Sequence, residues 1–193
     1  MERKEDKRVR RTKKRLRQAL VRLMQRQAFA SITVTEVVRE ADLTRGTFYA
    51  HYRDVSDLRE RLEDGIVADC RALLEDVRQP AGAAAKSVPA RMVDYVQDNR
   101  ETVTALLRAD GREGLGRKLI CLLEEWYMGF VPCRTAEDGY IARFVATGVV
   151  GLLERWVTEP QPMPPNELIE LIARLLTPVL RQKKEKKHPA YRF

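Results

Sequence analysis

Two helix-capping signals follow one another closely near the N-terminus of this chain. Thr33 and Glu36 form a capping box, in which each side chain pairs with the other residue's backbone N–H, and Thr44 is a second N-cap. Hydrophobic staple pairs flank both caps: Ile32 with Val37, and Leu43 with Phe48. The signals predict helices that begin near Val34 and Arg45 and are joined by a short turn, a helix-turn-helix.

The second predicted helix has one bulky face and one face almost without bulk. On a helical projection Phe48 and Tyr52 share the face that we assign to a small core, and Gly46 and Ala50 lie roughly opposite. Small residues there let the backbone approach a DNA groove closely. Donors suited to phosphates and base edges surround them: Thr44, Arg45, Thr47, Tyr49 and His51. An ordinary helical hairpin with a polar outer face is the alternative.

Basic residues are concentrated at the two ends of the chain. Residues 1–58 contain 15 Lys and Arg against 8 Asp and Glu, which gives +7 of the formal net charge of +8. Residues 59–180 contain 15 against 19, or −4, and residues 181–193 contain 6 against 1, or +5. This asymmetry favours a DNA-binding module joined to an acidic-to-neutral domain over the ordinary hairpin.

Ten cationic residues lie between Arg3 and Arg17, and this run passes into a predicted helix with one apolar face. We expect the front of that helix, with Arg10 and Arg11, to contact phosphates, and the preceding arm to enter an adjacent minor groove. A solvated, disordered run is the alternative for residues 1–8. The basic tail at 181–193 either adds nonspecific attraction to DNA or is a solvated terminus.

Composition argues against several other classes of protein. No apolar stretch approaches eighteen residues and no signal-type hydrophobic region follows the charged N-terminus, so we expect a cytoplasmic protein without membrane insertion. The chain has two histidines, His51 and His188, and no glycine motif that would cradle a phosphate. We therefore expect no enzyme, no metal site and no cofactor. We interpret Cys70, Cys121 and Cys133 as reduced, small buried side chains, with a redox sensor as the alternative.

Helical periodicity continues through the rest of the chain without convincing strand alternation, so the predicted fold class is all-α. A long helix is predicted from its cap Asp54 to Val77, where it would span about 35 Å and join the N-terminal head to the body. A connector at 80–90 comes next. Further helices are predicted at 90–98, 100–108 and 116–130.

The last two predicted helices are apolar on more than one side. The first repeats apolar residues from Ile141 to Trp156, and the second, capped by Asn166, repeats them from Leu168 to Val179. We expect one side of each helix to cover the body's core and the other to pair with a second subunit in a four-helix interface. The predicted interface residues are Val145, Val149, Leu152, Trp156, Leu168, Ile172, Leu175 and Leu176. Two central helices of a monomer are the alternative.

The first 65 residues or so resemble the DNA-binding head of the tetracycline-repressor (TetR/AcrR) family of bacterial transcription regulators. The matching segments are Ile32–Val38, Ala41–Tyr52 and Asp57-Leu58. More loosely, the body is similar to the C-terminal regions of regulators related to the dihydroxyacetone-kinase activator. The residues that carry this second resemblance are Asn99-Arg100, Leu106-Leu107, Phe144, Gly148, Gly151-Leu152-Leu153 and Trp156.

The resemblance implies that Thr44, Arg45 and Thr47 lie near base edges and that Tyr49 and His51 contact phosphates. The family usually carries a lysine at the start of the long helix, where this chain has Val55, and we interpret Arg53 as a replacement for its phosphate contact. The predicted DNA-binding residues are Arg10, Arg11, Thr33, Thr44, Arg45, Gly46, Thr47, Tyr49, His51, Tyr52 and Arg53.

The predicted organisation has three parts: an arm and helix-turn-helix domain at 1–58, a dimerisation and effector domain at 59–180, and the basic tail at 181–193. We expect a homodimeric, ligand-responsive repressor that reads a palindromic operator in double-stranded DNA. The alternative is an activator or switch controlled by a protein co-regulator. Candidates for an effector pocket are Met92, Tyr95, Trp126 and Tyr127, residue types that at helical spacing also form cores.

Overall fold

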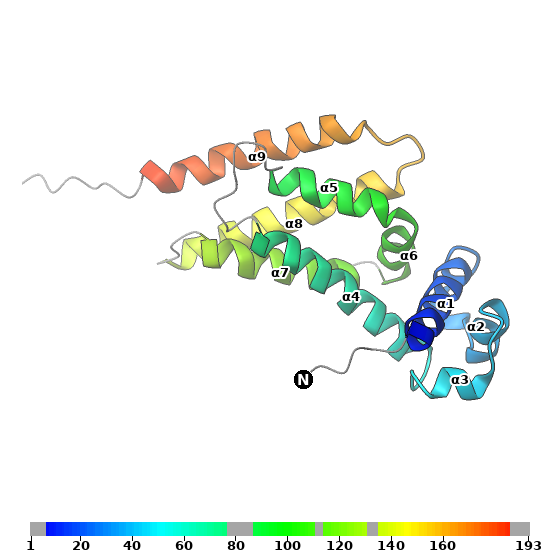
Figure 1. Cartoon of the computed structure of the whole chain (residues 1–193). Coiled ribbons are helices and arrows are strands. Elements are labelled where there is room, and N and C mark those ends of the chain that lie inside the picture. Colours follow the sequence, from blue (N-terminus) through cyan, green and yellow to red (C-terminus); the bar gives the residue numbers. More distant parts are fainter. Residues whose placement is uncertain (1–6, 77–86, 111–113, 131–134, 186–193) are drawn as a thin grey trace, which may run out of the picture. The chain divides into compact units, whose positions relative to one another are not determined.

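The computed structural model describes residues 7–76, 87–110, 114–130 and 135–185, and these ranges contain helices and no strand (Figure 1). The predicted all-α class is therefore confirmed. In chain order the elements are α1 (Lys7–Met24), the 3₁₀ turn η1 (Phe29–Ser31), α2 (Val34–Glu40), α3 (Arg45–Tyr49), α4 (Val55–Asp76), α5 (Val88–Asp98), α6 (Arg100–Asp110), α7 (Leu115–Phe130), α8 (Ala136–Thr158) and α9 (Pro165–Glu185). Within the described ranges, none of these helices combines the length and the hydropathy that crossing a bilayer requires.

Some predicted features lie outside the described residues. They are the N-terminal arm up to residue 6, the connector up to residue 86, Cys133, and the end of the basic tail from residue 186.

The chain forms two compact units, and each draws on separate stretches of sequence. Unit 1 contains the residues up to Asp69 together with Glu101–Leu115, and unit 2 contains Cys70–Arg100 and the residues from Gly116 onward. Helix α4 thus contributes to both units, and α6 lies almost entirely in unit 1. The contiguous domain ranges inferred from the sequence stay a prediction.

Both predicted capping signals in unit 1 are confirmed. The Thr33 hydroxyl accepts a hydrogen bond from Glu36 N at 3.3 Å, and the Glu36 carboxylate accepts one from Thr33 N at 2.9 Å, which completes the capping box at the start of α2. Thr44 caps α3 by accepting from Thr47 N at 3.2 Å. Each cap satisfies backbone donors that the first turn of a helix leaves unpaired.

One hydrophobic core holds the first four helices of unit 1 together. Helix α1 contributes its apolar face, α2 and α3 contribute their inward-facing apolar residues, and α4 contributes apolar residues of its first turn. Burial of these side chains is what makes short helices such as α3 stable, because isolated helices of this length are marginal in water. The buried residues are Leu16, Ala19, Leu20, Leu23, Ile32, Val37, Val38, Ala41, Phe48, Tyr52, Val55 and Leu58.

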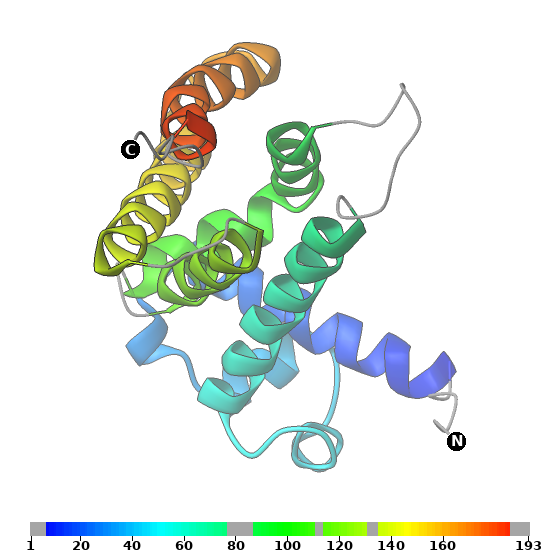
Figure 2. The same cartoon turned by 90° about the vertical axis from the view of Figure 1, so that its left-hand side faces the viewer.

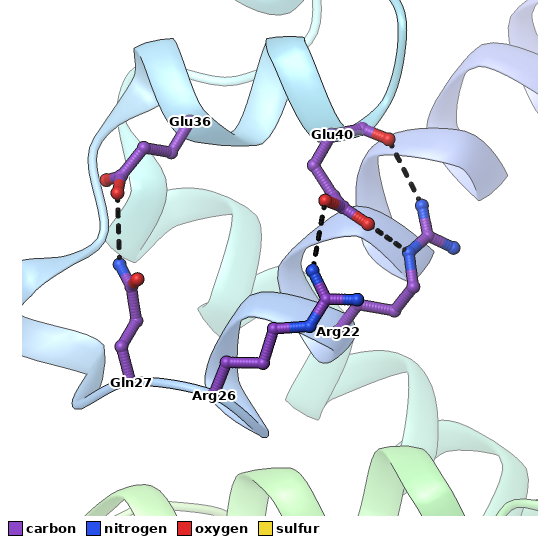
Figure 3. A network of polar contacts seen from close by, with 5 residues as sticks. All are labelled: Arg22, Arg26, Gln27, Glu36 and Glu40. Carbon is purple, nitrogen blue, oxygen red and sulfur yellow. Dashed lines mark hydrogen bonds and ion pairs between the residues drawn. The ribbon is translucent and has the colours of Figure 1, made fainter.

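Polar contacts fasten α2 to the end of α1 (Figure 3). Arg22 Nε donates to Glu40 Oε1 at 2.5 Å, and Arg26 Nη1 donates to Glu40 Oε2 at 3.4 Å. The hydrogen bond from Arg22 holds the pKa of the Glu40 carboxyl below its ordinary value. Gln27 Nε2 donates to Glu36 at 3.3 Å, so both acidic residues of α2 are tied to the preceding segment.

Helix α4 begins as predicted, with Asp54 accepting a hydrogen bond from Asp57 N at 2.8 Å. Asp57 in turn accepts from Arg53 N at 3.0 Å and from Arg61 Nε at 3.0 Å, and these bonds lower the pKa of its carboxyl. Val55, where the family usually has lysine, is buried in the core of unit 1. The apolar side chain there contributes to packing rather than to the surface.

In unit 2, α5 packs against α8 and α9, and α8 packs against α9 (Figure 2). Arg100, at the start of α6, closes the end of α8: its Nη2 donates to the carbonyls of Trp156 and Val157 at 3.2 Å, and its guanidinium lies 5.2 Å from the Trp156 ring centroid. These bonds satisfy carbonyls that the last turn of a helix leaves unpaired. Trp156 Nε1 donates to Met163 O at 2.8 Å, which fixes the loop after α8.

Three local predictions are wrong. Asn166 is not the cap of the last helix, because α9 already begins at Pro165, whose fixed φ suits a first helical position. The connector ends earlier than residue 90, because Ser87 caps α5 by accepting from Ala90 N. Cys121 is exposed rather than buried, whereas Cys70 is buried as predicted. Helix α9 also runs into the segment assigned to the tail, as far as Glu185.

Candidate DNA-binding surface and cavity

Helix α3 exposes small and polar residues on its outer side. Thr44, Arg45, Gly46 and Ala50 are exposed, while Phe48 on the opposite face is fully buried in the core of unit 1. Tyr49 is 59 % exposed, and its ring meets the Phe48 ring edge-on at 5.6 Å between centroids. The core therefore fixes the rotation of α3 and leaves its polar side chains facing outward.

Gly46 is not required by the packing of the chain itself. A Cβ built at this position would have Thr44 Oγ1 as its nearest neighbour, at 3.9 Å, which is an ordinary contact. Glycine inside a helix costs stability relative to alanine. A residue that weakens its helix without relieving a clash points to close approach of an external partner at this face.

Arg45 is held by the neighbouring helix. Its Nη2 donates a hydrogen bond to Thr35 Oγ1 on α2, although both residues are exposed. Thr35 was not among the residues predicted from the sequence; its position in the first turn of α2, two residues after the Thr33 cap, is the signal that could have found it. The contact pre-orients a guanidinium whose paired donors match guanine O6 and N7.

Thr44 and Thr47 form a second pair on this surface. Their hydroxyl oxygens are 2.9 Å apart, and the Thr44 oxygen also accepts from Thr47 N. Thr33, at the start of α2, is exposed as well, and its hydroxyl donates to Glu36 Oε2 at 2.8 Å. The Thr33 and Thr44 hydroxyls already cap helices and the Thr47 hydroxyl pairs with that of Thr44, which limits the directions in which these groups can bond a base or phosphate.

The remaining predicted DNA contacts differ in accessibility. Tyr52 is 2 % exposed and packs on Phe48, so it is a core residue and has no surface with which to touch DNA. His51 is half-buried beside it. The Arg53 side chain is 80 % exposed and lies 3.7 Å from the Asp57 carboxylate. On α1, Arg11 is exposed and Arg10 lines a hollow beside α6.

Unit 2 contains an apolar cavity of about 330 Å³ between α5, α7, α8 and α9. None of the described residues that line it is charged, and the Trp126 and Thr177 donors are used elsewhere: Trp126 Nε1 donates to Leu74 O at 3.3 Å and Thr177 Oγ1 to Ala173 O at 2.7 Å. The lining residues are Ser87, Val88, Pro89, Met92, Leu123, Trp126, Tyr127, Val145, Val149, Leu153, Ile172, Ala173, Leu176 and Thr177.

The cavity brings together three of the four predicted pocket residues. Met92, Trp126 and Tyr127 line it. Tyr95 does not, because only the first turns of α5 reach the cavity and Tyr95 lies one turn further along. Residues of α8 and α9 were not predicted to line a pocket, because their apolar side chains were assigned to a subunit interface.

The predicted interface residues divide into three groups. Val145, Val149, Ile172 and Leu176 line the cavity. Trp156 and Leu168 are buried within the chain, at 4 % and 2 % exposure, as is Ile172 at 2 %, and so they offer almost no area to a partner. Leu152 is half-buried, and Leu175 is 52 % exposed.

A different face of α8 is open. Tyr140 and Phe144 are 79 % and 72 % exposed, and Gly148 and Gly151 are exposed too, with open space where a Cβ would stand. At about 100° per residue these four positions fall within roughly 80° of the helix circumference, whereas Val145 and Val149 lie about 100° and 140° from the centre of that face. Helix α8 therefore has an apolar cavity face and a separate exposed face.

Two family models match the chain. Residues 16–62 match the model of bacterial regulatory proteins of the tetR family, and residues 86–178 match a transcriptional regulator C-terminal region of the same family. The HTH-type transcriptional regulator YxbF of Bacillus subtilis (strain 168) is 26 % identical over 166 residues, which make up 84 % of this chain. The chain spans 44 % of the length of that curated relative.

Solved structures show the same fold at low sequence identity. A TetR transcriptional regulator from Streptococcus agalactiae 2603V matches with a TM-score of 0.64 at 19 % identity, covering 89 % of this chain and 97 % of that one. The dihydroxyacetone kinase operon activator DhaS matches with 0.57 at 17 %, covering 90 % and 96 %. NalD of Pseudomonas aeruginosa, the secondary repressor of the MexAB-OprM efflux pump, matches with 0.65 at 16 %, covering 90 % and 96 %.

The matched models and structures are those of regulators rather than enzymes. Both family models match along one chain, and the capped helix-turn-helix lies within the residues that the tetR-family model covers. The chain belongs to the tetracycline-repressor family of DNA-binding transcriptional regulators.

Proposed function

We propose that the protein is a cytoplasmic, homodimeric repressor that reads a palindromic operator and releases it when an apolar effector binds in unit 2. The observation that carries the DNA-reading part is the bare outer face of α3, where Gly46 weakens the helix without serving the packing of the chain. In this proposal Thr44, Arg45 and Thr47 face base edges.

The phosphate contacts in the proposal come from side chains around α3. Tyr49 and Arg53 are well exposed, at 59 % and 80 %, and Arg11 is exposed on α1. His51 offers only part of its ring. Because Val55 is buried, Arg53 is the cation at the start of α4 that can replace the family's lysine.

The proposed dimer uses the open face of α8 together with exposed parts of α9. Two large aromatic side chains at 79 % and 72 % exposure, Tyr140 and Phe144, would be covered in a dimer. Gly148 and Gly151 on the same face allow a second helix to approach closely. An isologous interface would place two heads for the two half-sites of a palindrome.

The proposed effector is an uncharged, predominantly apolar small molecule. A volume of about 330 Å³ lies at the lower end of the range for small-molecule sites. An ion would lose its hydration there without finding a charge to pair with. Helix α4, with residues in both units, is the proposed route by which effector binding changes DNA affinity.

The similar structures differ in the sign of regulation. NalD is described as a repressor, whereas DhaS is described as an operon activator. We propose repression because a helix-turn-helix dimer that occupies its operator needs no further surface to block transcription. An activator needs a contact for the transcription machinery or a co-regulator, and no surface described above is assigned to one.

Selection of bound sites from random duplexes tests the DNA-reading part most directly. We expect a palindrome whose half-sites are about one helical turn apart, since two heads must meet the same side of the duplex. A pool without any common sequence would contradict sequence-specific reading. A single half-site without symmetry would contradict the dimer but leave the reading role of α3 intact.

The cavity is tested by filling it. Ala173 lines the cavity on α9, and Ala173→Trp would occupy space otherwise available to a ligand. In a thermal-shift screen, apolar ligands that stabilise the wild type should fail to stabilise Ala173→Trp, whereas Met128→Trp, on the exposed side of α7, should respond like the wild type. A co-regulator would be favoured by a different set of results. In that case no ligand stabilises the protein, one cellular protein is captured by it, and a reporter gene that it represses is released.

A further inference from the structure

Five basic side chains of α1 line one hollow of about 560 Å³ in unit 1. Helix α4 contributes Leu62 to the hollow, and the first turn of α6 contributes Thr102 and Glu101, the one carboxylate among the described lining residues. The five basic residues are Arg10, Lys13, Lys14, Arg17 and Arg22. The charge of the lining is therefore strongly positive.

The spacing of these residues is unfavourable for α1 itself. Arg10, Lys13, Lys14 and Arg17 stand three, four and seven positions apart, so they are neighbours on one helix face. The first turn of α1 contains no acidic residue, and like charges at this spacing repel each other. The core does not require them, because α1 packs on the core through its apolar face. A bound anion would relieve this repulsion.

Two further features of the lining suit an anion. The Nε–H of Arg17 is buried and has no hydrogen-bond acceptor among the described residues. The first turn of α6 carries the positive end of that helix's dipole. Arg22 is already paired with Glu40, and Arg10, Lys14 and Arg17 stand against Glu101, the one carboxylate among the described lining residues.

The hollow is separate from the surface proposed to read DNA. Figure 1 shows α6 and α3 on different sides of α1, so a duplex on the outer face of α3 would lie away from the hollow. Arginine and lysine are the side chains that proteins use for phosphate groups. We infer that this hollow binds a small soluble anion carrying two or more phosphate groups. The inference goes beyond the proposed function and assigns Arg10 to this anion rather than to the duplex.

Calorimetric titration of the full chain with pyrophosphate, at ionic strength held constant with sodium chloride, tests the inference. We expect saturable binding of one pyrophosphate per chain. Lys14→Gln with Arg17→Gln should lower the affinity by about tenfold or more, because each replaced cation removes a charge-assisted contact. Lys7→Gln with Arg8→Gln, which removes the same charge from α1 outside the hollow, should change it by less than about twofold.

Glu101→Gln separates binding from folding. Removing the one carboxylate of the lining should raise the pyrophosphate affinity several-fold, a gain that a damaged fold would not produce. Absence of saturable binding, or equal losses in both double variants, would overturn the inference and leave only nonspecific charge attraction. Circular dichroism of each variant checks that α1 remains folded.

A second titration distinguishes a soluble anion from a phosphate of the DNA backbone. Pyrophosphate is titrated into protein saturated with a duplex, either one selected for binding or a random one. Unchanged pyrophosphate affinity supports the soluble anion, whereas exclusion of pyrophosphate by the duplex overturns it and makes the hollow a backbone contact. The selection of bound sites from random duplexes tests the α3 surface and not the residues of the hollow. Failure of the operator-reading proposal and failure of the anion-binding inference can therefore be told apart.

Discussion

Arg15 on α1 fastens the turn between α2 and α3 by two hydrogen bonds to one residue, Asp42. Arg15 Nη2 donates to Asp42 Oδ2 at 2.8 Å and to the Asp42 carbonyl oxygen at 2.9 Å. Asp42 has a φ of 48°, and it is the one non-glycine residue with positive φ among those described. The turn that sets α3 relative to α2 therefore depends on a conformation that aspartate tolerates and most residues do not.

Asp42→Gly and Asp42→Val should differ sharply in stability. Glycine adopts the positive φ freely, and the ion pair that it removes is exposed and worth at most about 1 kcal/mol, so the two effects nearly cancel. Valine keeps the strain and adds a β-branched side chain, which should lower the free energy of unfolding by about 1–2 kcal/mol relative to glycine. Urea unfolding of both variants checks this. Equal stabilities would show that the turn relaxes.

Gly46→Ala should separate stability from DNA binding. Because a Cβ at this position meets no close neighbour, alanine should raise the free energy of unfolding by about 0.5–1 kcal/mol. If the face of α3 enters a groove closely, the same methyl group should weaken DNA binding by roughly tenfold. Thermal unfolding and fluorescence anisotropy on a selected duplex give the two values. Unchanged DNA affinity would remove the argument for close backbone approach.

Arg45→Ala should relax sequence preference at one operator position and cost about 1–3 kcal/mol of binding free energy there. Thr35→Val is the matched control, because it removes the acceptor that holds Arg45 but keeps the guanidinium. We expect a smaller loss in this variant with the sequence preference retained. Binding to a panel of single-base operator variants measures both. If Arg45→Ala weakens every sequence equally, Arg45 contacts the backbone instead of a base.

Glu40 should make the stability of the head depend on pH in the acid range. Its pKa in the folded chain lies below the ordinary value of 4.5, chiefly because of the Arg22 hydrogen bond. The resulting stabilisation is complete above that ordinary value and is lost as pH falls through the folded-state pKa. The melting temperature of Glu40→Gln should therefore be lower than that of the wild type at pH 7, and the difference should shrink between pH 5 and pH 3.

Glu170→Gln serves as the control for this pH series, because Glu170 is an exposed glutamate of α9. Its melting temperature should stay close to that of the wild type at pH 7. A gap between wild type and Glu40→Gln that stays constant from pH 7 to pH 3 would show that the carboxylate charge is not what Arg22 requires.

Phe144→Asp should convert the proposed dimer to monomers. The side chain is 72 % exposed in the single chain, so the substitution leaves the core of unit 2 intact but places a charge on the open face of α8. Met128→Asp, at a position 39 % exposed on α7, is the control and should leave the dimer unchanged. Sedimentation velocity reports the mass. A Phe144→Asp variant that stays dimeric would place the interface elsewhere.

The head was the more predictable part of the chain because its signals are local. The Thr33 and Thr44 caps act within one turn of helix, so the positions of α2 and α3 follow from adjacent residues. The burial of Phe48 likewise follows from helical spacing. Tyr52 was assigned both to the core and to DNA, and its burial in the folded chain, at 2 % exposure, favours the core.

The body was less predictable because its helices are apolar on several sides. Periodicity identifies apolar residues such as Val149 and Trp156, but it does not tell a cavity wall from a core residue or from a subunit interface. Trp156 is in the core because Arg100, distant in sequence, covers its ring. Val149 faces the cavity because α5, α7 and α9 leave a gap there. Both facts depend on long-range packing that no local pattern encodes.

Asp138 fixes where α8 begins. Its carboxylate accepts a hydrogen bond from Thr135 N at 3.0 Å, just ahead of the first turn of the helix. Asp138 is only 8 % exposed, and a negative charge near a helix N-terminus is favoured by the helix dipole. A helix that is apolar on several sides could begin one or two residues earlier or later at little cost in buried area. This local bond therefore sets the register in which α8 places its cavity-lining and exposed residues along its length.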